Sequence, residues 1–408
     1  MAARAIERQL NADTSDHAGP TFPCACGKAA RYAGRREKTF QTALGELTLN
    51  RAYYHCDACE SGFCPRDRAL GLEGTSLSPA VSRMVGLAAA MVSFAESSEL
   101  MWELAGVLVD PKQVERTAEA LGREIAQDER RVVEPEPPSA PTMYLGMDGT
   151  GVPMRKSETE SRAGKQPDGS AKTREVKLVT VWTAEGRDDE GIPVRDPGSV
   201  TYSAAIESAA SRDTDEQPSE FAQRADREAQ RRGFDQTPRR VVLGDGAPWI
   251  WNLADEQFPG AIQIVDLYHA KGHLWDMAKA IYGAGSDLGG QWAKQRRDEL
   301  DEGKIEAVLA ALRVHAQAKD EARKCLDYVT RNQSRMRYPD FRAQGLCVSS
   351  GVVEAGCKTA IGTRLKRAGM HWTVAGADAI IALRCSKLSG RFEDFWERRS
   401  AAAGAGAR

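Results

Sequence analysis

Three acidic residues, far apart in the sequence, are the side chains best suited to chemistry. Asp148 in YLGMDGTGVPM and Asp245 in VVLGDGAPWIW each follow an apolar, strand-like run and precede glycine, and Glu354 in GVVEAGCK begins a helical pattern. A carboxylate in a segment built for burial is costly unless it meets a cation or another partner. Two strand ends and a helix would supply three hard oxygen ligands, which suit Mg²⁺ or Mn²⁺. Taken singly, each acid has a plainer explanation, because Asp beside Gly is common in turns and Glu at a helix start complements the helix dipole.

The segments around these acids predict the elements that position them. Glycine and Pro248 end the apolar run before Asp245, as expected at the carboxyl end of a strand. A third strand, in AIQIVDLYHAKGH, ends at Asp266 and is followed by His269. Strands therefore alternate with helices from about residue 143 to 282, which favours an α/β fold.

A phosphatase of the haloacid-dehalogenase type is a competing interpretation of MDGTG and GDGAP. That chemistry needs an Asp-x-Asp nucleophile pair and a later Gly-Asp-Gly-x-Asn-Asp. Gly146 stands at the nucleophile position, and Ala-Pro-Trp follows Gly246. The covalent mechanism would lack its nucleophile, so we reject this interpretation.

Two short cysteine pairs near the amino terminus predict a structural zinc site. Short pairs carried on turns can place four thiolates around one tetrahedral Zn²⁺. The expected ligands are Cys24, Cys26, Cys56 and Cys59, with His55 and Cys64 as substitutes. Small buried thiols are the plainer alternative. The segment also carries Arg31, Arg35, Arg36, Lys38 and Arg51, which suit either a phosphate-facing surface or a solvated basic face.

A helical stretch follows the cysteine segment. Asp110 is placed to cap the last of its helices, and Pro111 stands at the first turn. The pattern resembles a helix-turn-helix whose second helix would present Lys112 and Arg116 to DNA. An ordinary packing of three helices fits the same pattern.

Composition sets broad limits on the protein. The chain has 408 residues, 41% of them hydrophobic and 28% charged, which is typical of a globular protein with two or three domains. A net charge of -2 does not by itself indicate a nucleic-acid partner. No apolar run reaches the length of a membrane span, and the opening MAARAIERQL is polar, so we expect a cytosolic protein. Nine cysteines then favour thiols or metal ligands over disulfides.

The order of motifs resembles that of DDE transposases, in particular the bacterial insertion-sequence transposases of the ISKra type, related to the Mutator superfamily. Asp148, Asp245, the signature Asp266-x-x-His269 and Glu354 carry the resemblance, together with RLKRAGMHW near the end. The likeness spans roughly residues 20 to 396 in ordered blocks. One departure is Ile361, which stands where many such enzymes have a basic residue two turns after the Glu, so that Lys358 or Lys366 would fill that role.

The resemblance implies a ribonuclease-H-like catalytic core with an all-helical insertion, after a zinc ribbon and a helix-turn-helix-like module. It implies two-metal-ion cleavage and strand transfer at the insertion-sequence ends, with Asp148, Asp245 and Glu354 as catalytic residues and metal ligands, and Asp266 and His269 as auxiliary residues. The partners would be double-stranded DNA, from transposon ends and target, and a second copy or larger synaptic assembly. The location would be the bacterial cytoplasm, at the nucleoid. The expected DNA contacts are Lys112, Arg116, Trp249, Lys358, Arg364, Lys366 and Arg367.

These expectations divide the chain into segments. The division is a flexible N-terminus (1–20), a zinc-ribbon-like domain (21–70), a helical DNA-binding module (75–131), a linker (132–142), the catalytic domain (143–282 and 346–396), the helical insertion (283–345) and a flexible tail (397–408). Two alternatives remain from other functional classes. One is a catalytically silent, transposase-derived DNA-binding protein, and the other is a ribonuclease-H-like nuclease.

Overall fold

The computed structural model describes residues 2–131, 137–160, 162–164, 166–210, 217–349 and 351–405. The chain divides into two compact units, one made of Met1–Glu129 with Ala379–Arg408 and the other of Arg130–Asp378. Part of the expected linker, residues 132–136, lies outside the described residues.

The first unit joins a small antiparallel sheet to a group of helices. The sheet has the order β1-β2-β3-β4, and β2 and β3 form its long central hairpin. The unit contains α1 (Ala2–Ala12), β1 (Thr21–Pro23), β2 (Ala29–Thr42), β3 (Gly45–Cys56), β4 (Ser61–Phe63), α2 (Pro65–Ala69), α3 (Pro79–Met91), α4 (Phe94–Ala105), α5 (Pro111–Asp128), most of α15 (Val374–Leu388) and α16 (Phe392–Ala405).

The N-terminal segment, which we expected to be flexible, forms a helix that is tied to β3. The Glu7 carboxylate accepts a 2.7 Å hydrogen bond from the Thr48 backbone amide. Asn11 donates to the Thr48 carbonyl and accepts from the Asn50 amide, both at 2.8 Å. Polar side chains therefore hold α1, although it buries no residue fully.

Side-chain caps begin two helices of the helical module, and one of these caps was predicted from the sequence. Asp110 accepts hydrogen bonds from the amides of Lys112 and Gln113 at the start of α5. Ser93 and Glu96 form a reciprocal capping box at the start of α4, and Gly106, at φ +62°, ends that helix.

The end of the chain corrects two expected boundaries. Residues 379–396, which the sequence assigned to the catalytic domain, belong to the first unit. Two contacts join them to the helices of that unit. The backbone of Ala379 lies close to Gly122 of α5, and Arg384 donates a hydrogen bond to the Ala90 carbonyl of α3. The expected flexible tail from 397 continues α16 as far as Ala405. Arg399 of α16 donates a hydrogen bond to the Glu124 carboxylate of α5 at 2.6 Å, and this bond anchors α16.

The second unit is a mixed α/β domain. It contains β5 (Thr142–Pro153), η1 (Lys156–Glu158), β6 (Thr173–Thr183), β7 (Gly186–Arg187), β8 (Pro193–Val194), β9 (Thr201–Ala205), α6 (Glu220–Arg231), η2 (Phe234–Gln236), β10 (Arg239–Gly244), α7 (Pro248–Gln257), β11 (Ile262–Val265), α8 (Leu267–Tyr282), α9 (Asp287–Asp301), α10 (Ile305–Ala316), α11 (Asp320–Asn332), η3 (Gln333–Arg335), α12 (Tyr338–Ala343), α13 (Val352–Gly356), η4 (Cys357–Gly362) and α14 (Thr363–Leu365).

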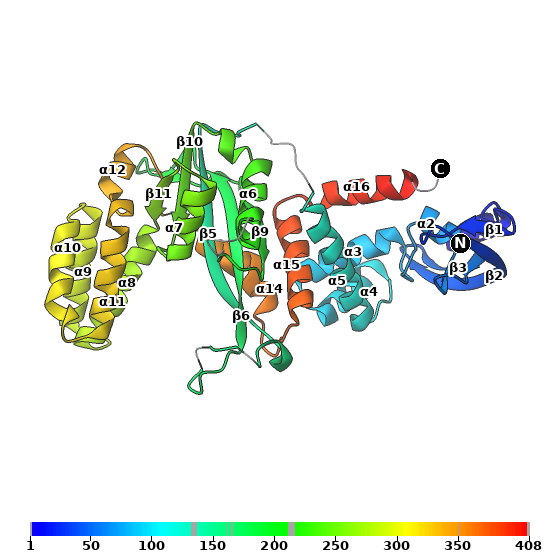
Figure 1. Ribbon diagram of the computed structural model, residues 1–408, viewed down its shortest axis with the longest axis horizontal. Coiled ribbons are helices and arrows are strands. Elements are labelled where there is room, and N and C mark those ends of the chain that lie inside the picture. Colours follow the sequence, from blue (N-terminus) through cyan, green and yellow to red (C-terminus); the bar gives the residue numbers. More distant parts are fainter. Residues whose placement is uncertain are drawn as a thin grey trace. The chain divides into compact units, whose positions relative to one another are not determined.

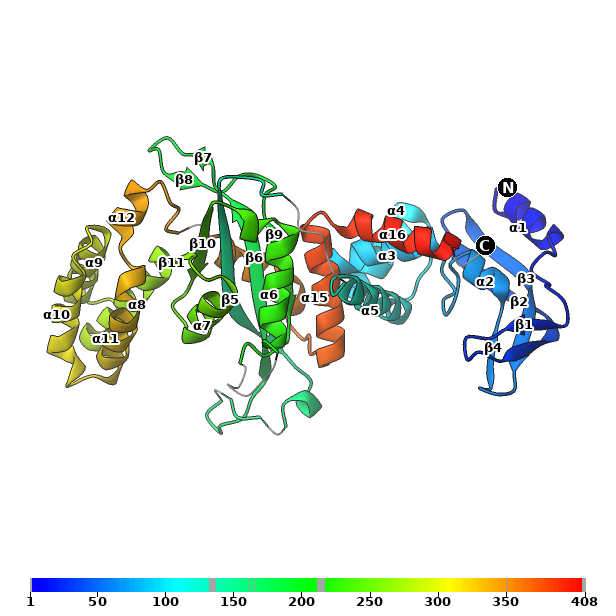
Figure 2. The same ribbon diagram turned by 45° about the horizontal axis from the view of Figure 1, so that its top comes forward.

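A five-stranded sheet in the order β11-β10-β5-β6-β9 forms the centre of this unit (Figure 1). The hairpin partners β5, β6 and β9 run antiparallel, whereas β10 and β11 run parallel to β5. Side chains alternate between the two faces of a strand. Trp249 of α7 contacts Lys177 on one face, and Val353 of α13 approaches Gly146 on the other. Figure 2 shows α6 lying along β6 and β9.

Residues expected to form a helical insertion do form helices. Between β11 and α13 the chain builds α8 to α12, and α8, α9, α10 and α11 pack against one another (Figure 1). Their apolar residues Leu312, Ala322 and Val329 belong to the same buried cluster as the sheet residues Val242 and Ile264. The insertion and the sheet therefore share one core.

Candidate functional site

Asp148 lies on β5, on the face of the strand that α13 covers. The sequence placed it at a strand end, but β5 continues to Pro153, because its antiparallel pairing with β6 outlasts its parallel pairing with β10. The Gly149 amide donates to Asp148 Oδ1 at 2.6 Å, and the Cys357 thiol hydrogen-bonds to the same carboxylate. Burial raises the pKa of Asp148, and the nearby charge of Asp245 adds to the shift.

Asp245 follows the last residue of β10. The register pairs Gly244 with Met147, so the next residues along these parallel strands, Asp245 and Asp148, meet at one edge of the sheet. The Ala247 amide donates to Asp245 Oδ1 at 2.8 Å. Gly246 has φ +97°, a left-handed conformation that favours glycine. The turn therefore fixes the backbone from which the Asp245 carboxylate projects.

Both carboxylate oxygens of Asp266 are engaged in hydrogen bonds within the protein. It caps α8, accepting hydrogen bonds from the amides of Tyr268 at 2.9 Å and His269 at 3.2 Å. Ser349 Oγ lies 3.1 Å from both carboxylate oxygens. Burial nevertheless raises the pKa of Asp266. These contacts fix the first turn of α8, which carries His269.

Glu354 belongs to the short helix α13. Its side chain is 69% exposed, and Oε1 lies 3.1 Å from the Lys358 ammonium one turn later. Val353, the preceding residue, packs against Gly146 on β5, which holds α13 on the sheet face that carries Asp148. Ile361, where a basic residue was expected, is fully buried, whereas the Lys366 ammonium reaches back to donate to Thr150 on β5.

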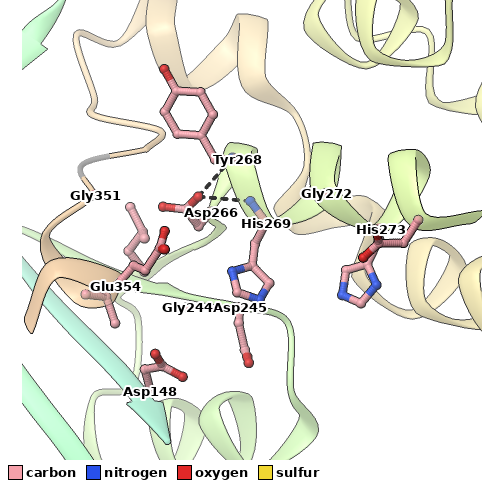
Figure 3. Close-up of a pocket in the computed structure, with 13 residues that line it drawn as sticks. Asp148, Gly244, Asp245, Asp266, Tyr268, His269, Gly272, His273, Gly351 and Glu354 are labelled. Atoms are coloured by element: carbon pink, nitrogen blue, oxygen red, sulfur yellow. Dashed lines mark hydrogen bonds between the residues drawn. The ribbon is translucent and has the colours of Figure 1, made fainter. Parts of the chain in front are cut away.

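One cavity of about 280 Å³ brings these acids together. Its lining includes Asp148, Asp245, Asp266, His269 and Glu354, all identified from the sequence (Figure 3). It also includes two residues that our sequence reasoning missed, His273 and Asp276. With His269 they stand at positions i, i+4 and i+7, a helical spacing that could have revealed them.

The acids share the cavity without forming a closed ligand cage. Among the residues that the structure describes, only the four cysteines form a group of three or more ligands whose atoms all lie within 4.8 Å of one another. The Glu354 carboxylate pairs with the Lys358 ammonium. The donor set still fits a divalent ion, because the carboxylates of Asp148, Asp245 and Glu354 supply hard oxygen ligands to one cavity.

The four cysteines converge at the ends of β1, β3 and β4. Cys24 and Cys59 sulfurs lie 3.6 Å apart, as do those of Cys26 and Cys56. A tetrahedral site with Zn–S bonds of about 2.3 Å separates its sulfurs by roughly 3.8 Å, so the geometry fits zinc. A hydrogen bond from Ser61 lowers the pKa of Cys59 to about 6, which favours a thiolate ligand.

The two substitute ligands considered from the sequence lie outside this cluster. His55 is directed towards Asp57, at 3.8 Å, and Cys64 is buried. Of the nearby basic residues, Arg35 pairs with Asp16 and Arg51 with Asp67. These ion pairs tie the sheet to its flanking segments, whereas Arg31, whose side chain is 73% exposed, pairs with Asp57 on the surface.

Two of the seven expected DNA contacts are directed into the protein. Arg364 is fully buried, with its guanidinium 5.4 Å from the centre of the Trp372 ring. Trp249 lies under the Lys177 ammonium, at 4.0 Å, and against the edge of Phe221. Both residues therefore serve packing, which their sequence neighbours alone did not indicate. The side chains that remain on the surface are Lys112, Arg116, Lys358, Lys366 and Arg367.

Comparisons with known proteins give a family match and a structural likeness. Residues 28–399 match the Uncharacterised protein family (UPF0236). A solved structure titled Drosophila P element transposase strand transfer complex is similar over 82% of this chain and 84% of its own, at 11% identity and a TM-score of 0.28. Curated proteins give no match. No helix among the described residues is both long and apolar enough to span a membrane.

Proposed function

We propose that this chain, which belongs to the UPF0236 family, is a DDE transposase of a bacterial insertion sequence, of the ISKra type related to the Mutator superfamily. It would cleave DNA at the ends of its element and join the freed 3′ ends to target DNA. One observation carries the proposal: Asp148 on β5 and Asp245, directly after the parallel neighbour strand β10, line one cavity, and Glu354 faces the same cavity from a helix packed on that sheet. The mixed sheet with the order β11-β10-β5-β6-β9 supports the proposal of a ribonuclease-H-like core.

Asp148, Asp245 and Glu354 are the residues that would hold Mg²⁺ or Mn²⁺. Divalent ions at such a site activate the attacking hydroxyl and stabilise the leaving oxygen of a phosphodiester. The remaining residues act by position and charge, which dominate phosphoryl transfer. Asp266 fixes the first turn of α8 and so directs His269 into the cavity. Lys366, held against β5 near Asp148, is placed to meet a phosphate of the bound strand.

The first unit would recognise the element's ends. We propose that Cys24, Cys26, Cys56 and Cys59 hold a structural zinc ion in a ribbon, with no free coordination position for catalysis. The exposed side chains of Lys112 and Arg116 on α5 would contact DNA. Because two ends must be joined in one complex, we propose that the protein acts as a homodimer or a larger assembly.

The test is strand cleavage and joining by the full chain on DNA that carries the element's ends, with Mg²⁺ or Mn²⁺. Asp148→Asn, Asp245→Asn and Glu354→Gln should each abolish both reactions and leave end binding intact. Asp255→Asn is the matched control, because Asp255 is an exposed acid on α7, ten residues after Asp245. Full activity in any of the three variants would refute the site assignment. End binding without cleavage by the wild type would favour the silent DNA-binding alternative.

A further inference from the structure

The turn that carries Asp245 is held from outside the sheet, by helix α11 of the insertion. Tyr328 and Asn332 stand one helical turn apart and project from α11 towards residues 245 and 246. Both side chains are buried, Tyr328 at 8% exposure and Asn332 at 2%. They come from a segment more than eighty residues further along the chain.

Two successive carbonyl groups of the turn receive these side chains. The Tyr328 hydroxyl donates to the Asp245 carbonyl at 2.8 Å, and Asn332 Nδ2 donates to the Gly246 carbonyl at 3.2 Å. The side-chain oxygen Oδ1 of Asn332 accepts from the indole Nε1 of Trp251 at 2.8 Å, so α7, which follows the turn, joins the same network. Backbone carbonyls in a turn have no strand partner, and these bonds satisfy them.

Packing enforces the same arrangement. A Cβ at Gly246 would lie 2.5 Å from Cε2 of Tyr328, so only glycine allows the tyrosine ring to approach. The Tyr328 ring also packs on His273, with ring centroids 4.1 Å apart, and His273 lines the cavity with Asp245. Tyr328 thus contacts both a residue of the cavity wall and the turn.

We propose that Tyr328 and Asn332 are positioning residues that hold the Asp245–Gly246 turn, so that the helical insertion sets where the Asp245 carboxylate lies. The expected effect on divalent-ion binding rests on the proposed function. The expected effect on the rigidity of the turn does not. Ligands on a loop need support from surrounding hydrogen bonds to keep a productive geometry. An error of about 1 Å in such a site can reduce turnover about a hundredfold.

Tyr328→Phe is the sharpest test, because it removes one hydroxyl and keeps the ring on His273. Tyr338→Phe is the matched control, since buried Tyr338 of α12 makes the same kind of bond, 3.1 Å to the Val265 carbonyl of β11. Hydrogen exchange over residues 244–250 reports the turn, where the Ala247 amide is bonded to Asp245. Titration of the full chain with Mn²⁺ alone measures the Mn²⁺ dissociation constant of the site that contains Asp245. Asn332→Ala provides an independent second variant.

We expect Tyr328→Phe to speed exchange in 244–250 and to raise the Mn²⁺ dissociation constant, each about fivefold, as for loss of one hydrogen bond. Tyr338→Phe should change neither. Cleavage should lose kcat while the KM for DNA ends stays constant. Exchange and Mn²⁺ affinity equal to those of Tyr338→Phe would overturn the proposal. A wild type that orders the turn as described but binds no Mn²⁺, or cleaves no DNA, would overturn the proposed function and leave the positioning role standing.

Discussion

Gly146→Ala is the substitution whose consequence the structure specifies most closely. Gly146 lies on β5 two residues before Asp148, so both face the same side of the sheet. A Cβ built at Gly146 would lie 2.3 Å from Cγ2 of Val353, 2.9 Å from Trp182 and 3.2 Å from Thr180. Val353 precedes Glu354 on α13. The extra methyl group therefore pushes directly on the helix that carries the third acid.

The size of the effect follows from that contact. Carbon atoms pack at about 3.5 Å or more, so α13 must move away from β5 by about 1 Å. Overpacking of this kind costs about 1–3 kcal/mol of stability. A displacement of about 1 Å at a catalytic group costs about a hundredfold in rate. We therefore expect a folded, less stable protein with about one hundredth of the cleavage rate.

The assay combines urea unfolding with metal-dependent strand cleavage. Gly290→Ala is the control: it adds the same methyl group within α9, where nothing lies within 4 Å, and should stabilise the protein by ~0.8 kcal/mol without loss of activity. In Gly146→Ala, the further change Val353→Ala removes the nearest clashing atom and should restore part of the activity. Wild-type stability and activity in Gly146→Ala would show that close packing of α13 on β5 does not position Glu354.

Three further predictions concern other parts of the chain. Although burial favours the neutral acid, hydrogen bonds from Lys271 and Arg342 hold the pKa of Asp301 below its usual value. The contribution of Asp301 to stability is therefore present above about pH 4 and is lost as the pH falls through its lowered pKa in the folded state. Asp301→Asn should cost about 0.5–1 kcal/mol in urea unfolding at pH 7, and this cost should shrink on acidification. Elemental analysis should find a zinc ion that Cys59→Ser or a chelator removes, and zinc retained in that variant would contradict the four-cysteine site. Arg364→Ala should lower stability by about 2–5 kcal/mol through lost packing. Arg367→Ala, at an exposed residue, should lower stability by much less and should reduce the salt dependence of DNA binding by about one unit of slope.

Features encoded in short stretches of sequence could be predicted. The paired cysteines on turns indicated a cluster, and four of their sulfurs do converge. Asp110 caps α5, and Asp266 ends a strand as its apolar run suggested. Asp148, Asp245 and Glu354 share a cavity, although their catalytic role stays a prediction. Each depends on local periodicity, turn chemistry or ligand spacing, which are properties of consecutive residues.

Features that depend on packing between distant segments could not be predicted from the sequence. Arg364 and Trp249 have the residue types of a DNA contact, but their neighbours in space bury one and cover the other. The helices at the end of the chain join the first unit through contacts more than two hundred residues apart in sequence.

The sequence by itself determined which residues could bind metals, that apolar strands precede Asp245 and Asp266, and that Gly246 marks a turn, because covalent neighbours decide these properties. Only the tertiary structure decided which acids keep carboxylate oxygens available to bind a metal ion. Asp266 is engaged as a helix cap, whereas Asp245 is held by Tyr328, a residue that carries no catalytic signal. The burial and the hydrogen-bond partners of a side chain depend on residues that folding brings together from distant parts of the sequence. The pattern of consecutive residues does not contain this information.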